Sequence, residues 1–462
     1  MTRKSVITLI YTASFAASIG IFFLIRYYGN SFVALSVAEG HGSLPVVPSE
    51  TAGILTRVLL AMVVVIAVAR ALGAVFRKLH QPQVTGEIVA GILLGPSFLG
   101  WVAPGVASQL LSTAVVPYLA VISQIGVVLY MFLVGLELDT DQLRQRTQAS
   151  IAISHASIVV PFLLGATVAL WLYPRYSTHN VSFTVFALFI GVAMSVTAFP
   201  VLARILTDRG MQKSRMGVLA LACAAVDDVT AWCLLAVVVG VARAESGKLL
   251  LTLATTVGFI AFLFLVGKRG ALWLVRRQIK VGRTTQGMFA MVCAALLLAA
   301  LITERIGIHA LFGAFLLGSL IPHDSALARD IREKSEDLVL VLLLPVFFAF
   351  TGLRTQLGLL NGARYWLACA LIIVVASVGK FGGSFLAARW TGSDWREAAS
   401  LGVLLNTRGL MELIVLNVGL DLGVLSPALF TIFVMMAVIT TLATAPILHL
   451  LAPNSLASSA SN

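Results

Sequence analysis

Charged residues are scarce in this sequence. Only 11% of its 462 residues are Asp, Glu, Lys or Arg, while 59% are hydrophobic. Soluble domains carry about 25% charged residues, and no soluble fold of this length could bury so much apolar surface. The composition therefore excludes a soluble globular protein and predicts an all-α polytopic membrane protein.

Cysteine is also rare. All four cysteines lie inside apolar runs, without CxxC or Cys/His spacing. They are typical of small buried hydrophobic residues. We therefore expect neither disulfides nor a structural metal, and the sequence predicts no cofactor.

Acidic residues are outnumbered by basic ones, 20 to 32, which gives a net charge of +12. Nucleic-acid binding requires basic residues that are clustered on one face. Here they are spread over short segments between apolar runs. We therefore expect the lipid bilayer, and no nucleic acid, as the macromolecular partner.

Apolar runs fill most of the chain. A membrane-spanning helix needs about 20 mainly apolar residues, and about 13 or 14 stretches qualify, of which the third and tenth are short. The candidates are 5–27, 52–76, 84–99, 115–136, 150–173, 181–206, 214–242, 250–267, 286–303, 308–320, 338–353, 365–389, 397–419 and 427–450.

Basic residues alternate between the two sides of these spans. With the N-terminus in the cytoplasm, 22 of the 32 basic residues fall on the inside and 8 on the outside. This bias is what the positive-inside rule predicts for a correct assignment. We therefore expect cytoplasmic N- and C-termini, in the inner (plasma) membrane of a bacterium.

The chain divides into three parts in this interpretation. Residues 1–50 form a membrane helix and an external loop, 51–453 form the main transmembrane domain, and 454–462 form a short polar tail. The first residues also resemble a cleavable signal. We favour a retained helix, because the apolar run continues through Phe22–Ile25.

Three sequence landmarks recur in the same order, which indicates an internal repeat. They are AGILLGPSFLG (90–100) with GAFLLGSLIP (313–322), FLVGLELDTDQL (132–143) with FAFTGLRTQL (348–357), and GVAMSVTAFPVLARI (191–205) with GVLLNTRGLMELIV (402–415). The repeats cover about 84–242 and 308–450, with five helices each. Seven helices separate their starts, so the second copy enters from the opposite side. The alternative is chance similarity between Gly/Leu-rich helices, and the shared order argues against it.

Five ionisable residues fall deep inside predicted spans, at Asp227, Asp228, Lys380, Arg408 and Glu412. Each costs about 2.5–3.5 kcal/mol to insert, so such residues are functional candidates. Adjacent aspartates point about 100° apart on a helix. We expect Lys380 to pair with Asp227, which leaves Asp228 for a transported ion. Arg408 and Glu412 are four residues apart and can satisfy each other. The alternative is a static ion network that fixes helix packing.

The equivalent helix of each repeat is predicted to be broken. Pro200 lies in mid-membrane in the first copy, where it removes a hydrogen bond and clashes with the preceding turn. Asn406, Thr407 and Gly409 stand at the same relative depth in the second copy. Broken helices free backbone carbonyls that can ligate a cation.

Acids near the predicted cytoplasmic ends of spans have a weaker claim to function. Glu87, Glu137, Asp139 and Asp141 belong to this group. We expect them to be solvated. Such acids at a funnel mouth could still attract cations.

At these residues the chain resembles the monovalent cation:proton antiporter superfamily, in the branch with bacterial sodium/proton antiporters, potassium-efflux antiporters and plant cation/proton exchangers. The similar stretches extend from Gln81 to Thr441. They include QPQVTGEIVAGILLGPSFLG, FLVGLELD, SVTAFPVLARIL, AAVDDVTAW, PVFFAFTGL and NTRGLMELIVLNVGLDLGVLSPALFTIFVMMAVITT.

The resemblance implies a homodimer whose core domain holds two crossed, unwound helices with the ion site at the crossing. It implies that Asp228 binds the transported Na⁺ or K⁺ and the proton. Asp227 would be salt-bridged to Lys380 in one state, and Thr197, Ser195 and nearby backbone would be supporting ligands. Many potassium-efflux members have Gln or Asn in place of Asp227 and a cytosolic regulatory domain. This chain has Asp227 at that position and shows no such domain. We expect from both differences an antiporter without regulatory gating.

The predicted function is exchange of Na⁺ or K⁺ for protons by alternating access, with both ions competing for the carboxylates. If Asp227 also releases a proton, two protons would exchange for one cation and transport would be electrogenic. A cation channel or uniporter is the main alternative, followed by an organic-anion symporter. A membrane aspartyl protease fits poorly, because its two carboxylates must face each other. We therefore expect a transporter and not an enzyme.

Overall fold

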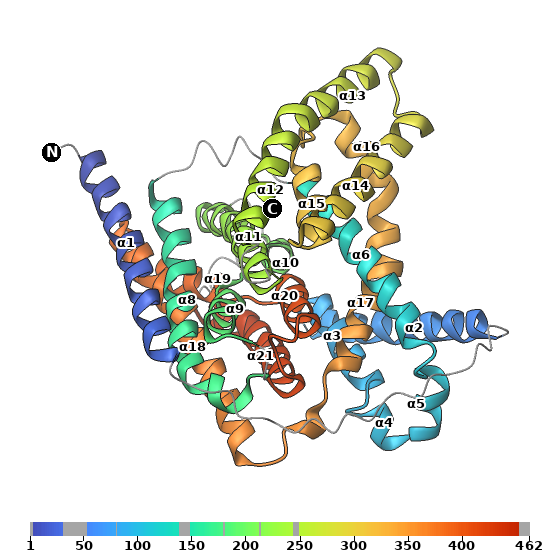
Figure 1. Ribbon diagram of the computed structural model, residues 1–462, viewed down its shortest axis with the longest axis horizontal. Coiled ribbons are helices and arrows are strands. Elements are labelled where there is room, and N and C mark those ends of the chain that lie inside the picture. Colours follow the sequence, from blue (N-terminus) through green and yellow to red (C-terminus); the bar gives the residue numbers. More distant parts are fainter. Residues whose placement is uncertain are drawn as a thin grey trace, which may run out of the picture. The chain divides into compact units, whose positions relative to one another are not determined.

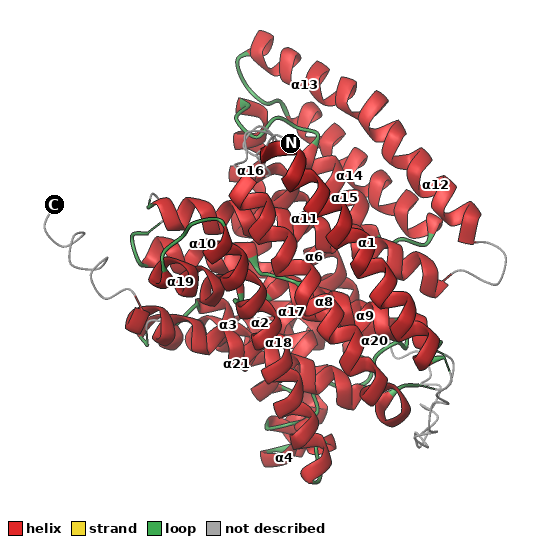
Figure 2. Ribbon diagram, turned by 90° about the vertical axis from the view of Figure 1, so that its left-hand side faces the viewer, coloured by secondary structure: helices red, strands yellow, loops and turns green. Residues whose placement is uncertain are grey.

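The computed structural model describes residues 3–30, 53–79, 81–137, 148–178, 181–211, 214–243 and 249–451. Within these ranges the regular elements are helices, joined by turns and loops (Figure 2). Most of the expected 28–50 loop, the 454–462 tail, Asp139 and Asp141 lie outside the described residues. The domain boundaries predicted there stay predictions.

The all-helical fold class is confirmed. In the described part of the chain, ten helices are long and apolar enough to cross a membrane, and a bent pair makes up to eleven. The other three predicted spans correspond to shorter apolar helices, Ala16–Gly29, Phe183–Ser195 and Ala310–Ser319. The predicted total of 13 or 14 membrane helices therefore stays open.

Helices of both predicted repeats contribute to each of two compact units. The first unit comprises Met1–Gly40, Arg146–Ala231 and Leu359–Asn462. Its helices are α1 (Arg3–Gly29), α8 (Gln148–Tyr176), α9 (Phe183–Ser195), α10 (Phe199–Asp208), most of α11 (Arg215–Arg243), α18 (Ala363–Trp390), α19 (Trp395–Leu405), α20 (Leu410–Asp421) and α21 (Pro427–Leu451) (Figure 1).

The second unit comprises His41–Gln145 and Trp232–Gly358. Its helices are α2 (Ile54–Lys78), α3 (Gln83–Leu94), α4 (Leu99–Val102), α5 (Pro104–Leu110), α6 (Val116–Glu137), the end of α11, α12 (Leu249–Phe262), α13 (Lys268–Val281), α14 (Gln286–Ile306), α15 (Ala310–Ser319), α16 (Ala326–Asp337) and α17 (Leu344–Arg354). The π-helical turns η1 (Leu263–Gly267) and η2 (Leu338–Leu343) join α12 to α13 and α16 to α17. The 3₁₀ turn η3 (Leu357–Leu359) contains the point in the chain where this unit ends, after Gly358.

In the second unit, glycines allow two equivalent close helix contacts. A Cβ on Gly95, next to the end of α3, would overlap the carbonyl of Gly352 in α17. A Cβ on Gly318 of α15 would overlap the backbone of α6 at Phe132 and Gly135. In the proposed repeat, α3 corresponds to α15 and α6 to α17. The two contacts are therefore counterparts, which supports the repeat.

In the first unit, α8 and α18 pack closely together and each also packs against a broken helix, α9 and α19 respectively. Gly379 and Gly383 of α18 leave room for the backbone of α8 at Pro161 and Ala156. This packing brings polar side chains of α8 and α18 to the ends of the broken helices.

The expectation that Glu87 is solvated was wrong. The side chain lies in α3 and is buried, and its carboxylate accepts a hydrogen bond of 2.9 Å from the Gln83 amide one turn earlier. Glu137 is partly exposed, at the end of α6, and pairs with Arg332 of α16 at 2.6 Å. Hydropathy alone could not foresee this burial, since it depends on how α2 and α17 pack over α3.

We predict that Gly318→Ala lowers the stability of the purified protein. The added methyl group must displace backbone of α6, and overpacking of this kind costs about 1–3 kcal/mol or more. Gly258→Ala in α12 is the control, because its Cβ would meet no atom within 4 Å and Ala is the better helix former by about 0.5–1 kcal/mol. The apparent melting temperature in detergent should fall for the first variant only. Equal melting temperatures would contradict the close α6–α15 contact.

Candidate functional site

Two broken helices lie against each other in the first unit. The helix of the first repeat stops at Ser195 and resumes at Phe199, and that of the second stops at Leu405 and resumes at Leu410. The Ala198 amide in the first break donates to the Thr407 carbonyl in the second, at 3.0 Å. The two interruptions predicted from the sequence are therefore in direct contact.

The first break has a local cause. Pro200 occupies the first turn of α10, where its missing N–H needs no partner. A helix running through this position would lose a hydrogen bond and clash one turn earlier, so α9 must end before it. The second break contains no proline. There α21 holds the backbone, since the Thr441 hydroxyl bonds both the amide and the carbonyl of Arg408, at 3.1 and 2.6 Å.

Arg408 satisfies two carbonyls at the end of α9. Its Nη1 and Nη2 donate to the carbonyls of Ala193 and Met194 at 2.9 and 2.6 Å, while Glu412 lies farther away, at 3.4 Å from Nη1. Arg408 and Glu412 are both completely buried. The carbonyl end of a helix carries partial negative charge that a cation stabilises. Arg408 therefore acts mainly on the broken helix, and Glu412 is its weaker partner.

Lys380 satisfies another of these carbonyls. Its ammonium group, from α18, donates to the carbonyls of Ser195 and Ser157 at 2.5 and 2.9 Å and to Asp227 at 3.0 Å. These three acceptors use all three N–H bonds of the lysine. The Ser195 hydroxyl turns back to the Val192 carbonyl at 2.9 Å. Polar side chains thus satisfy all four of the last carbonyls of α9, which lipid could not do.

Asp227 is held by four hydrogen-bond donors. The ion pair with Lys380 that the sequence predicts is present, and the hydroxyls of Ser154, Ser157 and Thr197 also donate to the carboxylate, at 2.7, 2.7 and 2.8 Å. Asp227 has no exposed surface. A buried carboxylate with this many donors is well satisfied in its ionised form.

Ser154 and Ser157 were missed from the sequence. With Ser150 they follow a spacing of four and three residues, which places all three on one face of α8. That spacing was the available signal. It is weak, because hydroxyl side chains in apolar helices usually bond their own backbone.

Asp228 differs sharply from its neighbour. Only 4% of its surface is exposed, and neither carboxylate oxygen has a hydrogen-bond partner among the described residues. Lys380 and the Phe199 amide, at the first residue of α10, attract its charge, and Asp227 repels it. A buried carboxyl without protein partners can be stabilised by a proton or by a cation. Chemically, it is suited to exchange one for the other.

Other predicted residues lie at the same two breaks. Asn406 follows α19 and reaches Ser377 of α18 at 3.5 Å, while its amide oxygen has no partner among the described residues. Gly409 directly precedes α20. Thr197 bonds Asp227 and lies 3.2 Å from the Leu405 carbonyl. The roles assigned to these side chains stay predictions.

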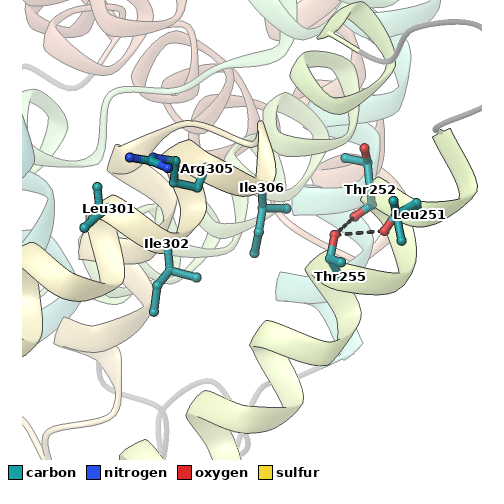
Figure 3. A pocket seen from close by; sticks show the side chains of 7 residues that line it. All are labelled: Leu251, Thr252, Thr255, Leu301, Ile302, Arg305 and Ile306. Carbon is teal, nitrogen blue, oxygen red and sulfur yellow. Dashed lines mark hydrogen bonds between the residues drawn. The ribbon is translucent and has the colours of Figure 1, made fainter.

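The described part of the chain holds no cluster of three or more His, Cys, Asp and Glu side chains that could form a metal site. A pocket of about 540 Å³ lies in the second unit between α12 and α14 (Figure 3). Its lining residues are Leu251, Thr252, Thr255, Leu301, Ile302, Arg305 and Ile306. No carboxylate is among them, so this pocket is not a candidate cation site.

Comparison with known proteins gives a consistent result. The sequence model of a family described as "Sodium/hydrogen exchanger, transmembrane" matches residues 59–451. A Na(+)/H(+) antiporter of Synechocystis, NhaS4, is 44% identical over 392 residues, which cover 84% of this chain and 96% of that protein. K(+)/H(+) antiporter 1 of Saccharomyces cerevisiae is 33% identical over 82% of this chain, which spans 44% of the yeast protein.

The fold is also found in a solved structure. The sodium proton antiporter MjNhaP1 from Methanocaldococcus jannaschii has a TM-score of 0.62 and 15% identity, over 87% of this chain and 99% of that one. At this identity the likeness establishes the fold alone. It agrees with the predicted antiporter fold.

Neutralisation of the two aspartates should affect the stability of the protein differently. Asp227→Asn removes the charged partner of Lys380, and breaking a buried ion pair costs about 3–5 kcal/mol. Asp228→Asn removes a buried carboxyl that no described side chain bonds and that Asp227 repels, so stability should be unchanged or higher. Apparent melting temperatures in a buffer without Na⁺ and K⁺ test this. A loss for Asp228→Asn as large as for Asp227→Asn would mean that Asp228 has a permanent partner.

Proposed function

The chain belongs to the sodium/hydrogen exchanger family, and on that premise we propose that it exchanges Na⁺ or K⁺ for protons by alternating access. The observation that carries this proposal is the pair of adjacent, buried aspartates beside two broken helices. One is bonded by four donors, and the other has both carboxylate oxygens unpartnered.

Asp228 is the group for which the two ions compete. A proton and a bare cation both neutralise a carboxylate, and neither can bind while the other is held. The backbone at the break and the Thr197 and Ser195 hydroxyls are within the same cluster of residues and are the proposed supporting ligands. The proton gradient supplies the driving force, since each pH unit is equivalent to about 1.36 kcal/mol.

The buried charges at the breaks favour exchange over uncoupled movement of the cation. The cluster of these charges consists of Asp227, Asp228, Lys380, Arg408 and Glu412. Asp227 is offset by Lys380, and Glu412 by Arg408. Asp228 is the remaining buried charge of the cluster. With a proton or a monovalent cation bound, the cluster is neutral; with neither, it carries one negative charge. Moving a buried charge through lipid is costly, so the empty form should not cross. This argues against the alternative of a uniporter or channel.

Electrogenic exchange of two protons for one cation remains a separate hypothesis. It requires Asp227 to bind a proton during the cycle and therefore to give up its ion pair with Lys380. Transport rates measured at different membrane potentials decide this point. Rates that do not depend on potential would exclude it and leave the exchange model intact.

The transported cation differs among the named relatives. The named relatives include Na⁺/H⁺ and K⁺/H⁺ antiporters and, in Bacillus cereus, a Na(+)/H(+)-K(+) antiporter, GerN, that is 28% identical. We further propose a homodimer in a bacterial inner membrane with cytoplasmic termini. The cyanobacterial relative supports the bacterial setting, and the distribution of basic residues supports the orientation.

Proton flux in proteoliposomes tests the function. Addition of Na⁺, K⁺, Li⁺ or Rb⁺ to vesicles that contain a trapped pH dye should move protons with the native protein. Asp228→Asn should reduce the flux to that of empty vesicles, because the exchanging group is gone. Asp337→Asn, an exposed acid at the end of α16, is the control and should be active. A channel would give no cation-driven proton movement. Native flux in Asp228→Asn would overturn the proposal.

Competition has its own signature in the pH dependence. Where the proton occupies Asp228, the KM for the cation should fall about tenfold for each unit of pH increase, because one proton must leave for each cation bound. The maximal rate should change much less. KM and maximal rate measured over several pH values in proteoliposomes check this. A constant KM with a varying maximal rate would contradict a shared site.

A further inference from the structure

A basic helix continues one of the apolar helices of the second unit. Figure 1 shows α13 as the direct extension of α12 through the turn η1. The 14 residues of α12 and the 5 of η1 contain no charged side chain. α13 contains five basic side chains and no acidic one. The character of a single helix therefore changes abruptly at Lys268.

Four large side chains form a stripe along the exposed face of α13. Arg269, Trp273, Arg276 and Lys280 are spaced by four, three and four residues, which places them on one side of a helix. All four are exposed. The opposite side is the buried one, with Ala271 and Gln278. We refer to these four residues as the basic stripe.

Within the described residues, no member of the basic stripe forms an ion pair or a hydrogen bond. The neighbouring helix α16 carries four acids, and two of them are engaged elsewhere. Asp330 accepts from the Thr284 hydroxyl at 2.5 Å, and Glu336 pairs with Arg332 at 2.9 Å. Like charges one turn apart, such as Arg276 and Lys280, repel each other. An anion from outside the chain would relieve this repulsion.

The position of the stripe fits the surface of a bilayer. The uncharged 19 residues of α12 and η1 extend about 28 Å, close to the thickness of the hydrocarbon core. The stripe begins two residues later, where headgroups start. Trp273 is exposed at this depth, and the Arg277 guanidinium lies 5.2 Å from its ring centre. Tryptophan is enriched at membrane–water interfaces, and basic residues next to a membrane attract anionic lipids.

We propose that the basic stripe is a binding surface for the headgroups of anionic phospholipids in the leaflet from which α12 emerges. The arginines bind lipid phosphate, and Trp273 lies among the headgroups. The bilayer is favoured over an acidic protein because this continuous helix is a candidate membrane span in length and composition, so the stripe is always next to headgroups. This surface is independent of the ion site in the first unit.

Lipid retention by the intact protein tests this proposal. The protein is purified in detergent, mixed with equal amounts of phosphatidylglycerol and phosphatidylcholine, and analysed by native mass spectrometry. The native chain should retain phosphatidylglycerol preferentially. The triple variant Arg269→Gln, Arg276→Gln, Lys280→Gln should lose this preference by about tenfold or more. The control, Arg305→Gln, Arg364→Gln, Arg396→Gln, removes the same charge at other exposed positions and should behave as the native chain.

Three results would overturn the proposal. They are an unchanged preference in the stripe variant, an equal loss in the control, and displacement of the lipid by millimolar inorganic phosphate, which would indicate a site for a free anion. Melting temperatures of both variants verify that they are folded. A second measurement uses brominated lipids in proteoliposomes. The contribution of Trp273 to the fluorescence is the difference between the native protein and the Trp273→Phe variant. Brominated phosphatidylglycerol should quench this contribution several-fold more than brominated phosphatidylcholine does. Equal quenching by the two lipids would also count against the proposal.

Discussion

The structure of the candidate site depends on one constraint: a helix that stops inside a membrane must have its last carbonyls satisfied by protein. The last four carbonyls of α9 accept from Ser195, Arg408 and Lys380. Lipid offers no hydrogen bonds, so these donors must be present wherever the break is. Their hydrogen bonds to these carbonyls explain why the side chains of Lys380 and Arg408 can be completely buried.

The same constraint makes the two adjacent aspartates different. Lys380 donates to the last carbonyl of α9 and to Asp227, and Asp227 also accepts hydrogen bonds from three hydroxyls. Asp228 points elsewhere on the helix and receives none of these donors. A group with many fixed partners holds the architecture, while a group without partners can exchange ligands. The different roles of the two carboxylates thus follow from the way in which the break in the helix is stabilised.

Both repeats contribute to both compact units. α3 and α6 of the first repeat pack with α17 and α15 of the second, while the broken helices of both repeats meet in the other unit. Sequence similarity predicts the repeats at their glycine landmarks, and the two counterpart contacts support this prediction. It could not show this exchange of partners, because the pattern within one repeat contains no information on which helices of the other repeat it will contact.

The helical membrane fold, the family, the five deeply placed ionisable residues and the break at Pro200 could be predicted from the sequence, because hydropathy, charge and proline geometry are local properties. Three other features became visible in the folded chain: Ser154 and Ser157 bond Asp227, Arg408 donates mainly to carbonyls of α9 and less to Glu412, and Glu87 is buried. Each of these depends on which helices pack together. Hydrogen bonding and burial are properties of the neighbours that packing brings together, and no local pattern encodes them.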